Sequence, residues 1–192
     1  MKIIAVIQLD RWLKQFDVVQ NKEALIAPIT RIVRLYKQCH TIHAWTFSLT
    51  YDKSYSTQAD ELAKLGVELQ PRDCFDPLTA FYELVTRCLS SSKVLNQETA
   101  IIRIDAGEMD PELELIDAML KNHIEHSHHY SRNRGAQHHD DIEIMNFSVL
   151  REAWQEALLP DDRLQITPYI YRQQQRLNLG FYPRPANATL CA

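Results

Sequence analysis

Histidine is the residue type whose spacing most invites a chemical interpretation in this chain. Six histidines fall between residues 123 and 139, and Asp140 and Asp141 follow directly. Imidazole and carboxylate groups at this density can hold Zn²⁺ or another borderline metal, with His126, His128 and His138 as the candidate ligands. The spacing matches no standard metal site. A metal site or a pH-responsive interface therefore stands beside the simpler interpretation of a solvated or interfacial loop.

The cysteines do not add to a metal or redox interpretation. Cys39, Cys74, Cys88 and Cys191 lie far apart in the sequence and form no CxxC pair. Such spacing indicates neither a zinc knuckle nor a dithiol redox motif, and unpaired cysteines are most often small buried side chains. We therefore expect buried free thiols.

Charge and hydropathy limit the classes of partner. Of the 192 residues, 45% are hydrophobic and 24% are charged, and the formal net charge is -4. Such a chain has no overall basic field, so we expect no nucleic-acid partner and no membrane surface. No apolar stretch approaches the roughly 20 residues that cross a bilayer, and the N-terminal residues do not match a signal peptide. We expect a cytoplasmic protein with a single domain over residues 1–175 and a tail over residues 176–192.

Strand and helix patterns alternate along the chain and must position any functional side chain. Continuous apolar runs, typical of strands buried on both faces, occur at residues 2–8, 42–49, 67–70 and 99–104, with a later strand at 142–147. Helical spacing predicts helices at residues 21–38, 57–65, 77–89, 148–158 and 162–174, and one that starts at Asp110-Pro111. Alternating strands and helices predict parallel pairing, and hence a Rossmann-like α/β/α sandwich of three layers with a mostly parallel sheet.

The ordered set of these segments resembles the cytidylyltransferases that make CMP-activated sugars, especially the branch of spore-coat polysaccharide biosynthesis. Five stretches carry the resemblance: Ile3-Ile-Ala-Val-Ile-Gln8, Ala63-Lys-Leu-Gly-Val67, Ile102-Arg-Ile104 with Asp110-Pro111, Asp141-Ile-Glu-Ile with Phe147 and Leu150, and Arg163 with Ile166-Thr-Pro-Tyr-Ile-Tyr171. Together they cover about positions 1 to 175 in the family's order.

The resemblance implies a nucleotidyltransferase of surface polysaccharide biosynthesis. In that family CTP binds over the sheet, a sugar hydroxyl or carboxylate attacks the α-phosphate, and pyrophosphate leaves with the help of Mg²⁺. It implies that Gln8, Asp141, Glu143, Arg163 and Thr167 lie near a nucleotide or sugar ligand. It also implies a homodimer, in which an arm at residues 123–147 reaches toward the partner subunit.

The segment after the first strand departs from the family. There the family carries glycines, whose amides approach phosphates, together with Arg and Lys. Counted without gaps, no glycine remains here, Asp10 replaces one cation, and Arg11 and Lys14 stand where the family has none. A carboxylate about 4 Å from a phosphate is unfavourable by roughly 1 to 4 kcal/mol. We therefore expect triphosphate affinity to be lower by orders of magnitude.

The segment after the fourth strand departs as well. It is two residues shorter than in the family, which places its Mg²⁺-binding aspartate there. Asp105 or Glu108 could stand in as the ligand, although neither keeps the family's spacing. Asp105 could also simply end the strand. The family's second metal carboxylate, which comes later in its chain, has no counterpart in this sequence.

Three hypotheses follow. In the preferred one, the protein is a degenerate cytidylyltransferase-like protein, silent or weak in catalysis, that binds a sugar or a partner. In the second, it is an active nucleotidyltransferase in which Arg11 and Lys14 supply the phosphate contacts and Mg²⁺ is the cofactor. In the third, it is a dimeric scaffold or a metal-binding protein that acts through its histidines.

Overall fold

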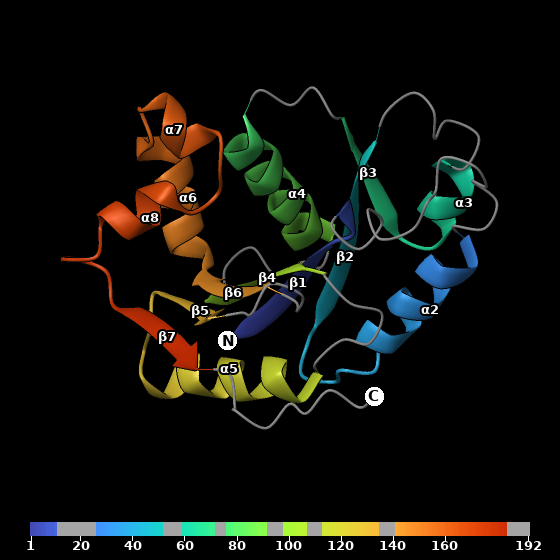
Figure 1. Ribbon diagram of the computed structural model, residues 1–192, viewed down its shortest axis with the longest axis horizontal. Coiled ribbons are helices and arrows are strands. Elements are labelled where there is room, and N and C mark those ends of the chain that lie inside the picture. Colours follow the sequence, from blue (N-terminus) through green and yellow to red (C-terminus); the bar gives the residue numbers. More distant parts are fainter. Residues whose placement is uncertain are drawn as a thin grey trace.

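A computed structural model describes residues 1–10, 26–51, 59–71, 76–91, 98–106, 113–134 and 141–183. Seven strands form one mixed sheet in the order β3-β2-β1-β4-β6-β5-β7 (Figure 1). The strands are β1 (Lys2–Gln8), β2 (Ala44–Tyr51), β3 (Val67–Pro71), β4 (Thr99–Asp105), β5 (Tyr130–Arg134), β6 (Asp141–Asn146) and β7 (Leu179–Pro183). The helices are α2 (Ile26–Tyr36), α3 (Ala59–Lys64), α4 (Pro77–Ser91), α5 (Leu113–Glu125), α6 (Phe147–Glu156), α7 (Pro160–Arg163) and α8 (Pro168–Arg172).

The centre of the sheet confirms the parallel pairing predicted from the apolar runs. Strand β1 pairs in parallel with both β2 and β4, and β2 pairs in parallel with β3. All five interior residues of β1, Ile3 to Ile7, are buried. A strand covered on both faces has no polar face to show, which explains the absence of an alternating pattern.

Helices cover both faces of the sheet, as the predicted three-layer architecture requires (Figure 1). One hydrophobic cluster joins alternate strand residues such as Ile102 and Ile104 to α2 and α5. A second joins the intervening residues, such as Ile4 and Val6, to α4, α6 and α8. Successive side chains of a strand point to opposite faces, so each central strand contributes to both clusters.

The sheet extends into the region predicted to be a tail. Strand β7 pairs in parallel with β5, from Tyr130 opposite Leu179 to Arg134 opposite Pro183. The segment predicted as a tail, residues 176–192, thus contributes an edge strand at Leu179–Pro183. Strand β7 lies at the edge of the sheet, where a proline is tolerated because one side of the strand needs no hydrogen-bond donors.

The prediction of one long helix at residues 162–174 is wrong. Two short helices, α7 and α8, take its place, and each has a proline in its first turn. Pro168 cannot donate a backbone hydrogen bond and disfavours a helical conformation of the residue before it. The chain therefore starts a new helix at Pro168 rather than continuing the first.

The predicted arm at residues 123–147 belongs largely to the sheet. It contains the end of α5, strand β5, strand β6 and the first residue of α6, and β5 and β6 pair antiparallel. Its proposed role in a homodimer stays a prediction. Among the described helices, none is long and apolar enough to cross a membrane.

Candidate functional site

Three of the predicted site residues form a row at the edge of the sheet where the parallel strands end. Gln8 of β1 lies opposite Asp105 of β4, and Asp105 lies opposite Asp141 of β6. Asp105 and Asp141 are both partly buried. Ligands of open α/β sheets bind outside the carboxyl ends of the strands, so this edge is the first place to look for a site.

One step inside this edge, a carboxylate lies between two arginines. Glu143 of β6 is in register with Arg103 of β4 on one side and with Arg132 of β5 on the other. Arg103 Nη1 donates to Glu143 Oε2 over 2.5 Å, and the two side chains are 20% and 11% exposed. The Nε atom of Arg103 is buried and has no hydrogen-bond partner within the described ranges. Glu143 thus serves as counter-ion close to both guanidinium groups.

Two tyrosines complete this polar network. The Tyr130 hydroxyl donates to Glu143 Oε1 over 2.7 Å and lies 2.8 Å from the Tyr171 hydroxyl, to which Arg132 Nη1 also donates. Burial, and next the charge of Glu143, raise the pKa of Tyr130, so its hydroxyl keeps its proton and remains a donor. Burial alone would lower the pKa of Arg132, but the interactions with Tyr171, Tyr130 and Glu143 together outweigh burial, and the pKa is raised. We call Arg103, Glu143, Tyr130, Tyr171 and Arg132 the arginine–tyrosine network.

Arg163, another predicted ligand residue, connects three helices. Its Nε donates to Asp76 Oδ2 over 2.7 Å and its Nη2 to Thr79 Oγ1 over 2.7 Å. Its Nη1 donates to the backbone carbonyls of Trp154 and Ala157 at the end of α6. These contacts account for its position by packing alone, so a ligand contact of Arg163 stays a prediction. Thr167, the residue before α8, makes no side-chain capping bond and opens the helix that carries Tyr171.

Asp76 is the N-cap of α4, and its carboxylate links this helix to Arg163. Oδ1 accepts the backbone N–H of Thr79 over 2.9 Å, the usual N-cap contact, and Pro77 fills the first helical position. Burial raises the pKa of Asp76, but the hydrogen bonds from Thr79 and Arg163 outweigh burial and leave the pKa below its usual value. The carboxylate therefore stays charged at neutral pH.

Several predicted residues lie outside the described parts of the chain. These are Arg11, Lys14, Glu108 and His138. His126 and His128 are described, and their rings stack with centroids 5.5 Å apart. In the described ranges no group of three or more His, Cys, Asp or Glu side chains could hold a metal ion. The proposed histidine metal site therefore stays a prediction.

The row at the edge can be compared with the donor set that Mg²⁺ prefers. Asp105 and Asp141 offer two carboxylates from neighbouring strands. Mg²⁺ is usually bound by one or two carboxylates together with phosphate oxygens and water, so this pair is compatible with it. If Mg²⁺ binds here, Asp105 and Asp141 are the residues that would hold it, and it would neutralise phosphate charge.

Sequence reasoning missed the residues that join Glu143 to its neighbours. Arg103 lies in the interior of a strand whose other central residues are buried and apolar, and a charge in such a strand needs a partner. That signal was present in the sequence. Arg132 had no such signal, because its strand β5 was not predicted.

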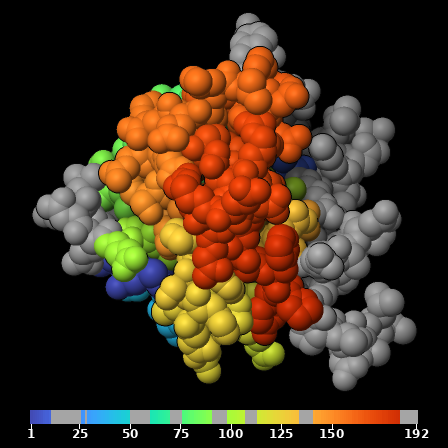
Figure 2. All heavy atoms as spheres, turned by 90° about the vertical axis from the view of Figure 1, so that its left-hand side faces the viewer, coloured from blue at the N-terminus to red at the C-terminus, as the bar shows by residue number. Residues whose placement is uncertain are grey.

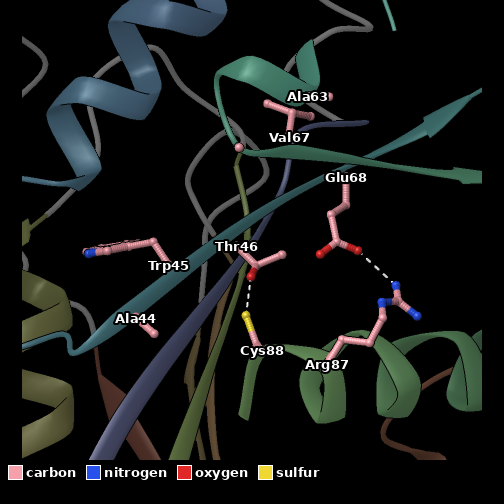
Figure 3. A pocket seen from close by; sticks show the side chains of 9 residues that line it. Ala44, Trp45, Thr46, Ala63, Val67, Glu68, Arg87 and Cys88 are labelled. Carbon is pink, nitrogen blue, oxygen red and sulfur yellow. Dashed lines mark hydrogen bonds and ion pairs between the residues drawn. The ribbon is translucent and has the colours of Figure 1, made fainter. Parts of the chain in front are cut away.

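A separate pocket lies on the β2–β3 side of the sheet, next to α4 (Figure 3). Its volume is about 520 Å³, and its lining comes from the first residues of β2 and β3 and from the second half of α4. Thr46 and Cys88 contact each other in its wall through a hydrogen bond, and Arg87 pairs with Glu68 over 2.8 Å. Burial raises the pKa of Cys88, so the thiol is not activated as a nucleophile.

Comparison with known proteins reveals a likeness in structure. A cytidylyltransferase from Leptospira borgpetersenii serovar Hardjo-bovis superposes with a TM-score of 0.64 at 17% identity, over 95% of this chain and 75% of the other. CMP:2-keto-3-deoxy-manno-octonic acid synthetase, solved with CTP, gives a TM-score of 0.59 at 9% identity, over 96% and 90%. The 4-diphosphocytidyl-2C-methyl-D-erythritol synthase of Anaerococcus prevotii gives 0.56 at 8% identity, over 96% and 88%.

Sequence comparisons give no such match. No protein-family model matches the chain, and no curated protein matches it. At these sequence identities, similarity between structures shows the fold alone. The mixed seven-stranded sheet, with helices on both faces, has the Rossmann-like α/β fold of the nucleotide-diphospho-sugar transferases.

Proposed function

We propose that this protein is cytidylyltransferase-like and binds a sugar that carries an anionic group. Its affinity for CTP is low, and its turnover of CTP is slow or absent. The observation that carries the proposal is the arginine–tyrosine network, in which one carboxylate, Glu143, lies between two guanidinium groups. The site is the carboxyl edge of the sheet, where Gln8, Asp105 and Asp141 align in register.

The network offers donors that an anionic ligand would use. Arg132 donates through Nη1 to Tyr171 and through Nε to the Asn133 carbonyl. Its remaining guanidinium hydrogens can reach a further acceptor, and a planar guanidinium recognises a carboxylate with two parallel hydrogen bonds. Because Arg132 is already held by Tyr171, little side-chain entropy would be lost when a ligand binds.

The comparisons support the choice of ligand class. The name of one fold neighbour contains a sugar acid, 2-keto-3-deoxy-manno-octonic acid. A sugar acid presents a carboxylate, which one guanidinium group recognises with two parallel hydrogen bonds. The role in surface polysaccharide biosynthesis that the sequence resemblance implies is part of the same proposal.

The low affinity proposed for triphosphate is inferred from the sequence after β1. Asp10 occupies a position at which the family has a cation, and no glycine follows to bring backbone amides close to phosphates. The active alternative is favoured by a different observation, the neighbouring carboxylates of Asp105 and Asp141. With Arg11 and Lys14 as phosphate contacts, that pair could support Mg²⁺-dependent transfer.

A calorimetric titration with a panel of neutral sugars and sugar acids tests the proposed ligand class. We expect saturable binding that prefers the acids. The Arg132→Ala variant should weaken it by about tenfold or more, because a hydrogen bond to a charged group contributes about 1.5 to 3 kcal/mol.

Arg87→Ala is the matched control, since Arg87 is 53% exposed and pairs with Glu68 of β3, which four strands separate from the strand β5 that carries Arg132. Binding should survive this change. The proposal fails if no sugar acid binds, or if Arg132→Ala and Arg87→Ala bind equally well.

A further inference from the structure

Four histidines gather where α5 ends and the chain turns into β5. They are His123, His126, His128 and His129, which we call the histidine cluster. Strand β7 lies against this region, beside α5, as the contact of the red and yellow surfaces shows (Figure 2). His123 is only 2% exposed, so the cluster includes a truly buried imidazole.

The hydrogen bonds in the cluster run in one direction. Asn146 Nδ2 donates to the His128 carbonyl, so Asn146 Oδ1 is free to accept from His123 Nε2 over 3.2 Å. His123 Nδ1 then carries a lone pair and accepts the Ser131 hydroxyl over 2.8 Å. The same hydroxyl oxygen accepts from His128 Nδ1 over 3.2 Å. This assignment of tautomers satisfies every member of the chain with neutral rings.

Neutral histidines also hold β7 in place. His129 Nδ1 accepts the backbone N–H of Asn178 over 2.8 Å, directly before β7 begins. A doubly protonated imidazole has no lone pair there and cannot accept this bond. Gly180 of β7 lies so close to the His128 ring that a Cβ atom would come within 2.3 Å of Nδ1. The position of the His128 ring and that of β7 are therefore coupled.

Charges around the cluster come from several elements. His126 stacks on His128, and His129 also acts on both His123 and His128. Glu152 of α6 interacts with His129 but is held by Arg176 and Tyr169. Lys121 and Glu125 of α5 pair with each other, and Tyr130 and Arg132 belong to the network on the opposite face of the sheet. Burial first, and then the like charge of neighbouring rings, therefore opposes protonation of His123 and His128.

We propose that the histidine cluster is a pH-sensitive contact that holds β7 and β5 on the sheet when its rings are neutral and loosens them when the rings are protonated. The proposal does not depend on the ligand that the protein binds. It concerns the stability of the fold. It also bears on the arginine–tyrosine network, because β5 carries Tyr130 and Arg132.

The sign of the effect follows from proton linkage. Burial lowers the pKa of His123, and burial followed by His126 and His129 lowers the pKa of His128, below the usual 6.5. The opened chain therefore binds protons more readily than the closed one as the pH falls below about 6.5. The contribution of these residues to stability is complete above that pH and is lost progressively below it, toward the lowered pKa values.

Hydrogen exchange followed by mass spectrometry at pH 7.5, 6.5 and 5.5 tests the proposal on the full chain. Rates are corrected for the intrinsic pH dependence of exchange, and β1 and β4 serve as internal references. Between pH 7.5 and 5.5 we expect the protection of β7 to fall, relative to these references, by up to about tenfold for each histidine that titrates.

Variants and a direct titration make the test decisive. In His128→Asn the amide can still donate to Ser131 but cannot titrate, so the pH effect on β7 should shrink. The control is His40→Asn, which changes an exposed histidine outside the cluster and should leave the effect unchanged. The NMR signals of the His123 ring should show that its pKa lies below the usual 6.5, because the ring is buried. Equal protection of β7 at all three pH values, or a His123 ring whose pKa is not lowered below the usual 6.5, would overturn the proposal.

Discussion

At the scale of single residues, the ion pair between Arg103 and Glu143 has the largest predicted effect on stability. Glu143→Ala leaves a mostly buried guanidinium without its counter-ion and removes the acceptor of Tyr130. Loss of one partner from such a pair costs about 3 kcal/mol or more. Urea denaturation should show this loss as a lower midpoint.

A matched exposed pair provides the comparison. Glu68→Ala breaks an ion pair whose side chains are 53% and 40% exposed, and such pairs contribute about 0 to 1 kcal/mol. Equal destabilisation by Glu68→Ala and Glu143→Ala would mean that burial of the Arg103 pair is not what matters.

Asp76 should contribute to stability in a way that depends on pH. Its pKa is lowered in the folded protein from 3.8, so its contribution is complete above about pH 4 and is lost as the pH falls through the lower folded value. Urea midpoints measured between pH 6 and pH 2.5 should therefore show a component that Asp76→Asn removes. Asp161→Asn, at an exposed position in α7, is the control. If Asp76→Asn keeps the full acid dependence of the wild type, the contact with Arg163 does not stabilise the charged form.

The candidate site could be predicted only in part at this scale. Short stretches of sequence indicate Gln8, Asp105, Asp141 and Glu143 as candidates, and the sheet aligns the first three because their strands are adjacent. A ligand contact of these residues stays a prediction. The residues that surround Glu143 depend on strand pairing across the sheet. The sequence of a polar segment such as β5 does not indicate which carboxylate will lie beside it in the folded sheet.

At the scale of elements, β7 shows how a glycine can be required because a neighbouring side chain leaves no room. Gly180→Ala would place a Cβ within 2.3 Å of the His128 ring, so the ring must move and its bond to Ser131 must weaken. We expect a loss of about 1 to 3 kcal/mol, as for overpacking elsewhere, measured by urea denaturation. Thermal scans should also show that the variant has lost part of the pH effect.

Gly66→Ala gives the contrasting case. Gly66 follows α3 with a φ of +83°, and no atom lies within 4 Å of the place that a Cβ would take, so its cost is backbone strain of about 1 to 2 kcal/mol. That cost should not depend on pH. If Gly180→Ala were as stable as the wild type, His128 would not be packed against β7.

The predicted elements succeeded where hydrophobicity alone decides and failed where pairing decides. Strands β1 and β4 are apolar runs that could only be buried, and α3 ends before Gly66, within the helix predicted at residues 57–65. Strands β5 and β7 carry polar residues, glycine and proline, and become strands only because β6 offers an edge on which β5 and then β7 can pair. The prediction of one helix at 162–174 is wrong because it followed the helical spacing of apolar residues, whereas Pro168 starts a new helix.

At the scale of the whole molecule, the expectation of a homodimer can be tested through an exposed apolar group. Leu158, Leu159 and Leu164 flank α7 and are 88%, 55% and 57% exposed. Light scattering across a concentration series should give the mass of a dimer. If this exposed group forms part of the contact, Leu158→Glu combined with Leu164→Glu shifts the mass toward that of a monomer, because a charge replaces exposed apolar area. A strict monomer in the wild type would end this expectation.

The proposed function combines the fold of the nucleotide-diphospho-sugar transferases with a low affinity for triphosphate. The most direct measurement is a calorimetric titration with CTP in the presence and absence of Mg²⁺. We expect no binding tighter than about 1 mM in either case. The carboxylate of Asp10 would repel the phosphates, and no glycine follows it to bring backbone amides close to them. A micromolar signal that requires Mg²⁺ and disappears in Arg11→Ala would contradict the account and favour an active transferase.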